Sequence, residues 1–218
     1  MSDDLLFQEV DEDVRQEQYK KLWQRYGNYL MALCVAVVTA VAGFKGWEYW
    51  QVKQAETAAD VFLDAEQLAA TDKADDALAR FAAVNHQGYG QLARLREAGV
   101  LLGQDKTEAA VKIYDAVAAD AGADAALRDF ARVRAAYALT GSLKPAEIEA
   151  RLAAVNTDTN VWRHAAREAI ALSQFASADY AAADRTATAI LADAAAPAGI
   201  QQRMSMLSQV LAPLVPEK

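Results

Sequence analysis

The sequence predicts an all-α protein in which one N-terminal transmembrane helix precedes an array of helix pairs. The 218 residues include only 10 glycines and 4 prolines, too few for the many tight turns of an all-β domain. Alanine is abundant, and apolar residues do not alternate with polar ones as a half-buried strand requires. One long segment lacks any charge, and short motifs recur 33 and 38 residues apart.

The composition excludes several functions. The net charge is -8, and such an acidic chain lacks the basic surface that nucleic-acid phosphates require. The single cysteine, Cys34, excludes a disulfide framework and a cysteine zinc site within one chain. Two histidines leave little room for a histidine metal site. We therefore expect no nucleic-acid partner, no metal and no cofactor.

A transmembrane helix is predicted over residues 27–50. Residues 27–44 carry no charge, and 18 helical residues rise roughly 27 Å, close to the hydrocarbon thickness of a bilayer. Lys45 and Glu48 follow one turn apart and can pair, which lets the helix continue to Trp50. Aromatic residues flank the segment on both sides, as is typical of membrane interfaces: Trp23, Tyr26 and Tyr29 before it, and Phe44, Trp47, Tyr49 and Trp50 after it.

Two other interpretations of this segment remain open. A helix buried in a soluble core can be equally apolar. A cleaved signal peptide is also conceivable, because Ala40-Val41-Ala42 has the small-x-small form that a signal peptidase accepts. However, the 26 residues before the segment carry seven acids, and the apolar run exceeds the usual length of about 7–15 residues. We therefore expect a retained anchor.

The basic residues predict the orientation of the anchor. Four of them precede it: Arg15, Lys20, Lys21 and Arg25. Two follow at a comparable distance: Lys45 and Lys53. By the positive-inside rule, residues 1–26 form an acidic cytoplasmic tail, 27–50 the span, and 51–218 a periplasmic domain. That domain has no cysteine, which suits an oxidising compartment.

One face of the predicted span carries only small side chains. Its members, three or four residues apart, are Ala32, Ala36, Ala40 and Gly43. Small residues at this spacing allow another helix to approach closely, so this is a candidate helix-packing face. The alternative is that alanine is simply tolerated in the span.

The periplasmic part contains internal repeats. Residues 92–98 match 130–136 at an offset of 38, and 167–169 match 134–136 at an offset of 33. Residues 77–81 likewise match 110–114 at 33. These periods are typical of helix-turn-helix repeats that stack into a solenoid. The four predicted pairs and a final capping helix span 55–84, 89–120, 125–155, 161–193 and 198–211.

Capping residues predict where several helices begin. We expect Thr71-Asp72 to cap the second helix of the first pair, and Asp105 with Glu108 to form a capping box. Side-chain caps are predicted at Asp124 and Asp179. Pro145 and Pro197 are expected to open helices.

No recognised catalytic motif is present. The sequence lacks a P-loop, an HExxH motif, a nucleophile elbow and a glycine-rich dinucleotide fingerprint. His86 and His164 are interpreted as surface hydrogen-bonding residues, and the acids at helix starts as capping residues. We therefore expect neither catalysis nor a small-molecule substrate.

Arginine recurs on the first helix of the pairs. The seven positions are Arg94, Arg96, Arg128, Arg132, Arg134, Arg163 and Arg167. If first helices line the concave face of the solenoid, these residues form a stripe that binds acidic or C-terminal carboxylate groups of a partner. The alternative is a solvated face paired with Glu97, Asp129 and Glu168.

The anchor region resembles a known bacterial family. The similar motifs are Phe7 with Glu9-Val10-Asp11-Glu12, then Leu22-Trp23 with Tyr26-Gly27, and Gly46-Trp47-Glu48-Tyr49-Trp50. With the helix pairs, they resemble the ancillary subunit of the Sec translocon that has a tetratricopeptide-like domain. Strict tetratricopeptide residues are sparse, which leaves the repeat boundaries and groove residues open.

The resemblance implies a single-pass inner-membrane protein with a periplasmic tetratricopeptide-like α-solenoid. Its partners would be the Sec translocon, exported polypeptides and periplasmic chaperones, with membrane lipid around the span. The alternative function is a soluble or anchored periplasmic tetratricopeptide adaptor in envelope assembly or cell division. The soluble form requires cleavage after Ala42.

Overall fold

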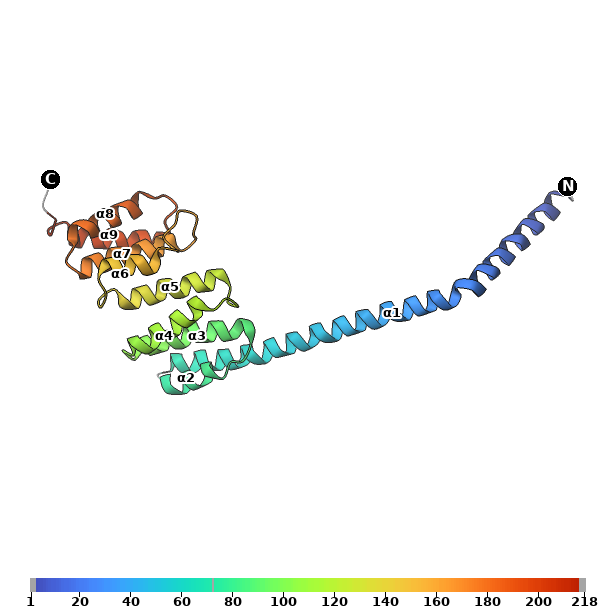
Figure 1. Cartoon of the computed structure of the whole chain (residues 1–218), viewed down its shortest axis with the longest axis horizontal. Coiled ribbons are helices and arrows are strands. Elements are labelled where there is room, and N and C mark those ends of the chain that lie inside the picture. Colours follow the sequence, from blue (N-terminus) through green and yellow to red (C-terminus); the bar gives the residue numbers. More distant parts are fainter. Residues whose placement is uncertain (1–2, 72, 216–218) are drawn as a thin grey trace. The chain divides into compact units, whose positions relative to one another are not determined.

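The computed structural model describes residues 3–71 and 73–215, and all regular structure within them is α-helical (Figure 1). The helices are α1 Asp3–Ala70, α2 Ala74–Ala82, α3 Gln87–Gly103, α4 Thr107–Ala119, α5 Ala125–Leu139, α6 Pro145–Leu152, α7 Arg163–Ala176, α8 Tyr180–Ala192 and α9 Ala198–Leu211. The chain divides into two compact units, Met1–Gln54 and Ala55–Lys218, and α1 contributes to both. The predicted all-helical fold class is confirmed.

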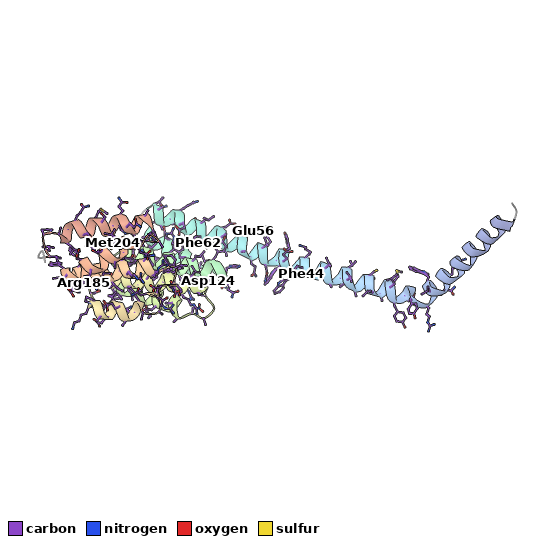
Figure 2. The ribbon with its side chains drawn as sticks, turned by 90° about the horizontal axis from the view of Figure 1, so that it is seen from above. Phe44, Glu56, Phe62, Asp124, Arg185 and Met204 are labelled. Carbon is purple, nitrogen blue, oxygen red and sulfur yellow. The ribbon has the colours of Figure 1, made fainter. Side chains whose placement is uncertain are left out.

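The first unit consists of α1 alone. Side chains project from it on all sides, and Phe44 is two-thirds exposed (Figure 2). The predicted pairing beyond the apolar segment is confirmed, because Lys45 Nζ lies 2.6 Å from Glu48 Oε2. Among the described residues, α1 is the helix that is long and apolar enough to cross a membrane.

The helix α1 is continuous through residues 26 and 50, so the proposed limits of the span do not coincide with a break in secondary structure. Those limits stay a prediction. The side chains of Arg15, Lys21 and the acidic residues before them lie outside the part of the chain whose side chains the structure describes.

The second unit contains the predicted helix pairs. The end of α1 pairs with α2, and α3–α4, α5–α6 and α7–α8 follow, with α9 last. Along this series α3 contacts α5, α5 contacts α7, and α7 contacts α9, whereas α2, α4, α6 and α8 do not contact one another. The first helices therefore form one continuous layer, and the second helices pack against it without contacting one another.

Four hydrophobic clusters hold this unit together, each shared by a pair and the next first helix. In the first cluster Phe81 is 2 % exposed against α1 and α3, and in the second Tyr114 is 1 % exposed between α3 and α5. Fully buried alanines, such as Ala77 and Ala110, lie beside these rings. The repeated motif at 77–81 and 110–114 therefore marks an aromatic wedge next to a close helix crossing.

Several predicted caps are confirmed. Asp124 Oδ1 accepts a hydrogen bond from Ala126 N at 2.8 Å, and Asp179 Oδ1 accepts one from Ala182 N at 3.1 Å. Pro145 is the first residue of α6, and Pro197 immediately precedes α9. The two aspartates accept hydrogen bonds from backbone N–H groups that have no partner inside the helix, whereas proline has no N–H group that would need one.

The capping box at Asp105 and Glu108 is wrong. Asp105 has a left-handed backbone with φ of 60°, and the residue before α4 is Lys106, which makes no side-chain cap. Lys106 N donates to Leu101 O at 2.9 Å and Asp105 N to Leu102 O at 3.1 Å. Asp105 is thus the left-handed residue of a Schellman motif that ends α3, a conformation incompatible with an N-cap.

The cap predicted at Thr71-Asp72 is also not made by Thr71. Its Oγ1 donates to Gln67 O at 3.0 Å and Leu68 O at 3.2 Å, so this residue ends α1 rather than starting α2. Asp72 lies outside the described residues. A hydroxyl next to a helix C-terminus reaches the free carbonyls more readily than the N–H groups of the next helix.

Candidate partner-binding surface

The structure separates the predicted arginine stripe into two sets. The repeat offsets align Arg94 with Arg132, and Arg96 with Arg134 and then Arg167. Residues two apart on a helix differ in direction by about 200°. Arg132 Nη2 accordingly donates to Ala118 O, at the end of α4, at 3.1 Å. Arg96 instead binds Glu66 on α1.

The inner set follows the layer of first helices. Arg96 Nε and Nη2 donate to the two carboxylate oxygens of Glu66 at 2.6 and 2.9 Å. Arg167 donates to Asn156 Oδ1 at 3.0 Å and to Asp158 Oδ1 at 2.7 Å. Arg134, between these two in the repeat order, makes no hydrogen bond or ion pair with any described residue.

Arg203 on α9 extends this series, and the sequence interpretation missed it. It lies 36 residues after Arg167, close to the offsets of 38 and 33 between the earlier arginines. Its Nε and Nη2 donate to Glu168 at 2.5 and 2.7 Å. We call Arg96, Arg134, Arg167 and Arg203 the arginine ladder. The repeat period was the signal that could have identified its last member.

A buried carboxylate anchors the end of the ladder. Glu168 is 1 % exposed and receives a third hydrogen bond from Tyr137 Oη at 2.8 Å. Burial and the adjacent carboxylate raise the pKa of Tyr137 far above its ordinary value, and the bond to Glu168 raises the pKa of Arg203. Glu168 therefore joins α5, α7 and α9 instead of pairing with the arginines beside it on α7.

The outer set faces the second helices. Arg94 lines a pocket of about 730 Å³ with His86, Glu97 and Asp120. Hydrogen bonds from Gly122 N and Gln91, with lesser contributions from the nearby arginines, lower the pKa of Asp120. Burial raises the pKa of Glu97. The pocket thus mixes both signs of charge.

The other arginines of the outer set differ in their contacts. Arg132 Nη1 lies 2.5 Å from Asp129 Oδ1, and Asn160 Nδ2 donates to the other oxygen of Asp129 at 2.8 Å. Arg128 Nε is buried without a hydrogen-bond partner among the described atoms. Arg163 Nη2 lies 3.9 Å from Asp193 Oδ2. The expected acidic partners of the stripe were Glu97, Asp129 and Glu168. Of these, Asp129 forms an ion pair with a stripe arginine, Arg132.

Phe130 and Trp162 form what we call the apolar shelf, which lies near Arg134 on α5. Phe130 precedes Arg134 by one helical turn, and the rings of Phe130 and Trp162 are 5.2 Å apart. Trp162 Nε1 donates to Ala126 O at 3.1 Å, which fixes the indole against α5. Val161 is 77 % exposed, the highest value among the large apolar side chains described. Arg134, a cation with no partner among the described residues, thus lies one helical turn from a half-buried aromatic pair.

The two histidines differ from each other. His86 Nδ1 accepts hydrogen bonds from Gly88 N at 3.3 Å and Tyr89 N at 3.4 Å, and so caps α3 as a surface residue. His164 was expected on the surface, but it is 4 % exposed, with Nε2 3.5 Å from Asp193 Oδ2. Burial lowers the pKa of His164, and Arg163 lowers it further. The start of α7 packs against the end of α8, which encloses the imidazole.

The span carries the predicted small-residue face. Ala32, Ala36, Ala40 and Gly43 are all exposed on α1, and a Cβ placed on Gly43 would contact no other side chain. Their role in helix packing stays a prediction. No group of three His, Cys, Asp or Glu side chains suited to a metal lies within the described part of the chain.

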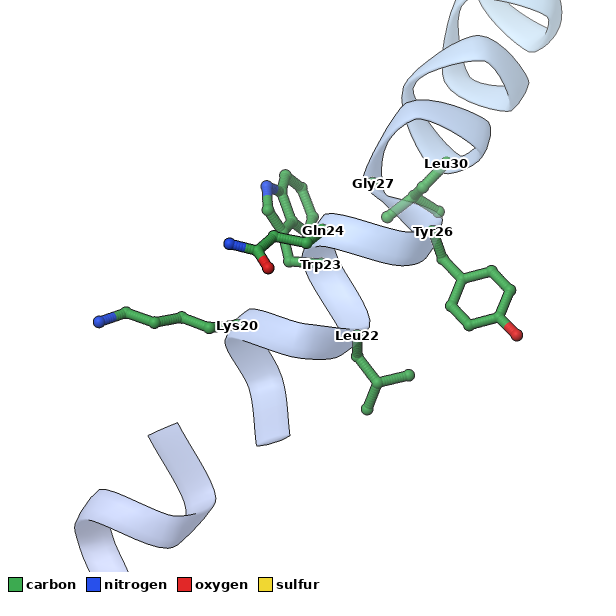
Figure 3. Close-up of a pocket in the computed structure, with 7 residues that line it drawn as sticks. All are labelled: Lys20, Leu22, Trp23, Gln24, Tyr26, Gly27 and Leu30. Carbon is green, nitrogen blue, oxygen red and sulfur yellow. The ribbon is translucent and has the colours of Figure 1, made fainter. Parts of the chain in front are cut away.

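A hollow lined in part by aromatic side chains lies at the start of the apolar segment (Figure 3). Its lining includes Trp23, Tyr26 and Leu30. The indole of Trp23 lies against the bare backbone of Gly27, where an added Cβ would be 3.2 Å from the ring. The hollow is formed by α1 alone, and its amphipathic rings are of the kind found at membrane interfaces.

Comparison with known families defines the class of protein. Residues 20–163, about two thirds of the chain, match the tetratricopeptide repeat-like domain family. The chain therefore belongs to this family, whose members are helical scaffolds for protein–protein interaction and typically not enzymes. Searches of curated proteins and of solved structures returned no significant match.

Proposed function

We propose that this protein is a membrane-anchored interaction scaffold that serves as an ancillary subunit of the Sec translocon. Residues 1–26 would lie in the cytoplasm, and 51–218 would contact exported polypeptides and chaperones in the periplasm. The main support for a retained membrane anchor is the extent of the family match, which begins at residue 20, before the apolar segment. The family model therefore includes the apolar segment together with the first repeats.

The environment of α1 supports an anchor that stays in the bilayer. Its large apolar side chains, including Val38 at 67 % and Phe44 at 66 %, are exposed rather than packed in a protein core. Exposing so many apolar groups to water is unfavourable, whereas lipid solvates them. The Lys45–Glu48 pair reduces the cost of extending the span toward the second aromatic group.

The partner would bind at Arg134 and the adjacent apolar shelf. The other three arginines of the ladder already hold carboxylate or amide oxygens of the chain itself. Arg134 retains its donors for a ligand, and a guanidinium binds carboxylate in bidentate geometry. The ligand that fits is an extended polypeptide segment with an acidic side chain or C-terminal carboxylate next to an apolar residue.

Affinity purification from gently solubilised membranes tests this function. The wild-type chain should copurify with the translocon channel and exported polypeptides. Arg134→Glu should reduce the bound polypeptides by about tenfold, because it replaces attraction with repulsion. Arg185→Glu is the matched control, since Arg185 is exposed on the second helix α8 and should leave binding unchanged.

Recovery of the intact chain without any translocon subunit would contradict the assignment. The alternative, a periplasmic adaptor released by cleavage, is favoured only by the Ala40-Val41-Ala42 motif. Mass spectrometry of the mature N-terminus distinguishes the two, because the adaptor would begin after Ala42.

A further inference from the structure

The hollow at the start of the apolar segment is lined by groups of decreasing polarity along α1. Lys20, Gln24 and Gly27 are four and three residues apart, so they share one face of the helix (Figure 3). Leu30 lines the hollow about one turn beyond Gly27. Toward the span, the lining thus passes from an ammonium group to an amide, then to bare backbone, and then to an aliphatic side chain.

The glycine at position 27 keeps the hollow open. The indole of Trp23 lies against Gly27, and an added Cβ would be 3.2–3.4 Å from three atoms of this ring. Gly27 is buried under the indole, although its neighbours on α1 are exposed. Any side chain at this position would displace the ring or fill the space, so the hollow depends on glycine.

The polar groups at the hollow are mainly hydrogen-bond donors. The ammonium of Lys20, the indole N–H of Trp23 and the amide of Gln24 make no hydrogen bond or ion pair with another described residue. Ammonium and indole groups only donate, whereas an amide both donates and accepts. A group that accepts several hydrogen bonds and carries negative charge therefore fits this donor set.

The charges next to the hollow are positive. Between Glu17 and the span the chain carries no acid, so the acids of the tail lie farther from the membrane. The basic residues in this stretch are Lys20, Lys21 and Arg25. The guanidinium of Arg25 lies 5.8 Å from the centre of the Tyr26 ring. Basic residues directly beside a span attract anionic lipid headgroups.

We propose that this hollow binds the headgroup of an anionic phospholipid, with the phosphate at Lys20 and Gln24 and an acyl chain along Leu30. The inference rests on the membrane anchor of the proposed function. Gln24 precedes Gly27 by about 5 Å of helix and Lys20 by about 10 Å, which covers a headgroup region of about 5–8 Å on each side of the hydrocarbon core.

A phospholipid has its groups in the same order as the hollow. Its charged phosphate is followed by polar ester linkages and then by the acyl chains. A free phosphate ion would bind the donors but would leave Leu30 and the face of the Trp23 indole uncovered. The whole lining is therefore matched by the lipid and only its outer end by the free ion.

Native mass spectrometry of the full-length chain in mild detergent, titrated with phosphatidylglycerol or with phosphatidylcholine of the same acyl chains, tests the proposal. The wild type should bind phosphatidylglycerol about fivefold more tightly. Lys20→Gln should remove about that factor, the usual contribution of one basic residue near an anionic surface. Lys45→Gln is the matched control, because Lys45 pairs with Glu48 at the other end of the apolar segment.

A second pair of variants tests the shape of the hollow. Gly27→Leu should fill it and lower the affinity for phosphatidylglycerol about as much as Lys20→Gln does. Gly46→Leu is the matched control, since a Cβ at Gly46 meets no atom within 4 Å, and it should leave the affinity unchanged. Each variant should remain in carbonate-washed membranes, which shows that its anchor is intact.

Equal affinity of the wild type for the two lipids would overturn the proposal, and so would equal losses in Lys20→Gln and Lys45→Gln. Displacement of the bound lipid by inorganic phosphate alone would also overturn it, because the site would then hold the free anion. These results would leave the anchor in place. Release of the wild type from carbonate-washed membranes would instead overturn the anchor, and this site with it.

Discussion

At the scale of single residues, the second unit depends on a charge that its fold buries. Glu168 is 1 % exposed and is stabilised by Arg203 and Tyr137 from two other helices. A buried carboxylate is tolerated only when its oxygens are paired and hydrogen-bonded. The side chain of Arg203 is 54 % exposed, so the two partners should respond unequally to mutation.

Arg203→Ala should destabilise the protein more than Glu168→Gln. The first leaves a buried carboxylate without its cation and should lower the free energy of unfolding by roughly 3 kcal/mol. The second leaves a solvated arginine and should cost about 1–2 kcal/mol. Urea denaturation measures both, with Arg185→Ala as the exposed control. A double variant that loses the full sum would show that the residues are not coupled.

His164 should make stability depend on pH in the mildly acidic range. Its folded-state pKa is lowered, mainly by burial, with Arg163 and Arg167 lowering it and Asp193 opposing them. The neutral form is therefore favoured on folding. Its contribution is complete above about pH 6.5, the unfolded pKa, and is lost as the pH falls through the folded pKa.

Unfolding measured from pH 7 to pH 5 should show a steeper loss of stability for the wild type than for His164→Gln. The difference in slope should not exceed about 1.4 kcal/mol per pH unit, the limit for one proton. Parallel curves for the two proteins would mean that the imidazole does not contribute.

At the scale of helices and turns, the C-terminal ends of α3 and α7 have the same conformation. The ends of α3 and α7 both use a left-handed residue, Asp105 and Ala178, each with φ of 60°. At α7, Asp179 N donates to Gln174 O at 2.9 Å and Ala178 N to Phe175 O at 3.0 Å. Alanine is unfavourable in this conformation because its Cβ crowds the following carbonyl.

Ala178→Gly should raise the free energy of unfolding by about 0.5–1 kcal/mol, because glycine adopts the left-handed region without strain. Ala176→Gly, two residues earlier and still helical, should lower it by about 0.5 kcal/mol. Both alanines are exposed, so packing changes little. Thermal denaturation compares the pair, and a loss for both would show that position 178 is not strained.

The sequence predicted the helices better than the turns. The motif at 77–81 and 110–114 located buried aromatic wedges, since burial follows apolar periodicity. Asp105 was misassigned because aspartate serves both at N-caps and at left-handed positions. The ion pairs of Arg203 and the burial of His164 depend on helices more than 25 residues apart, which local patterns do not encode.

At the scale of the whole molecule, the repeats place the proposed binding surface on the layer of first helices. The layer of first helices carries the arginine ladder, with Arg134 as its member without a partner and the apolar shelf beside it. The last helix of the series, α9, leaves Met206 and Val210 half exposed.

The retained anchor is the central claim, and alkaline carbonate extraction followed by mass spectrometry tests it most directly. We predict that the polypeptide stays in the washed membrane pellet with residues 27–50 intact, because lipid solvates the span. Recovery in the supernatant of a chain that begins after Ala42, or of the full-length chain, would contradict the account.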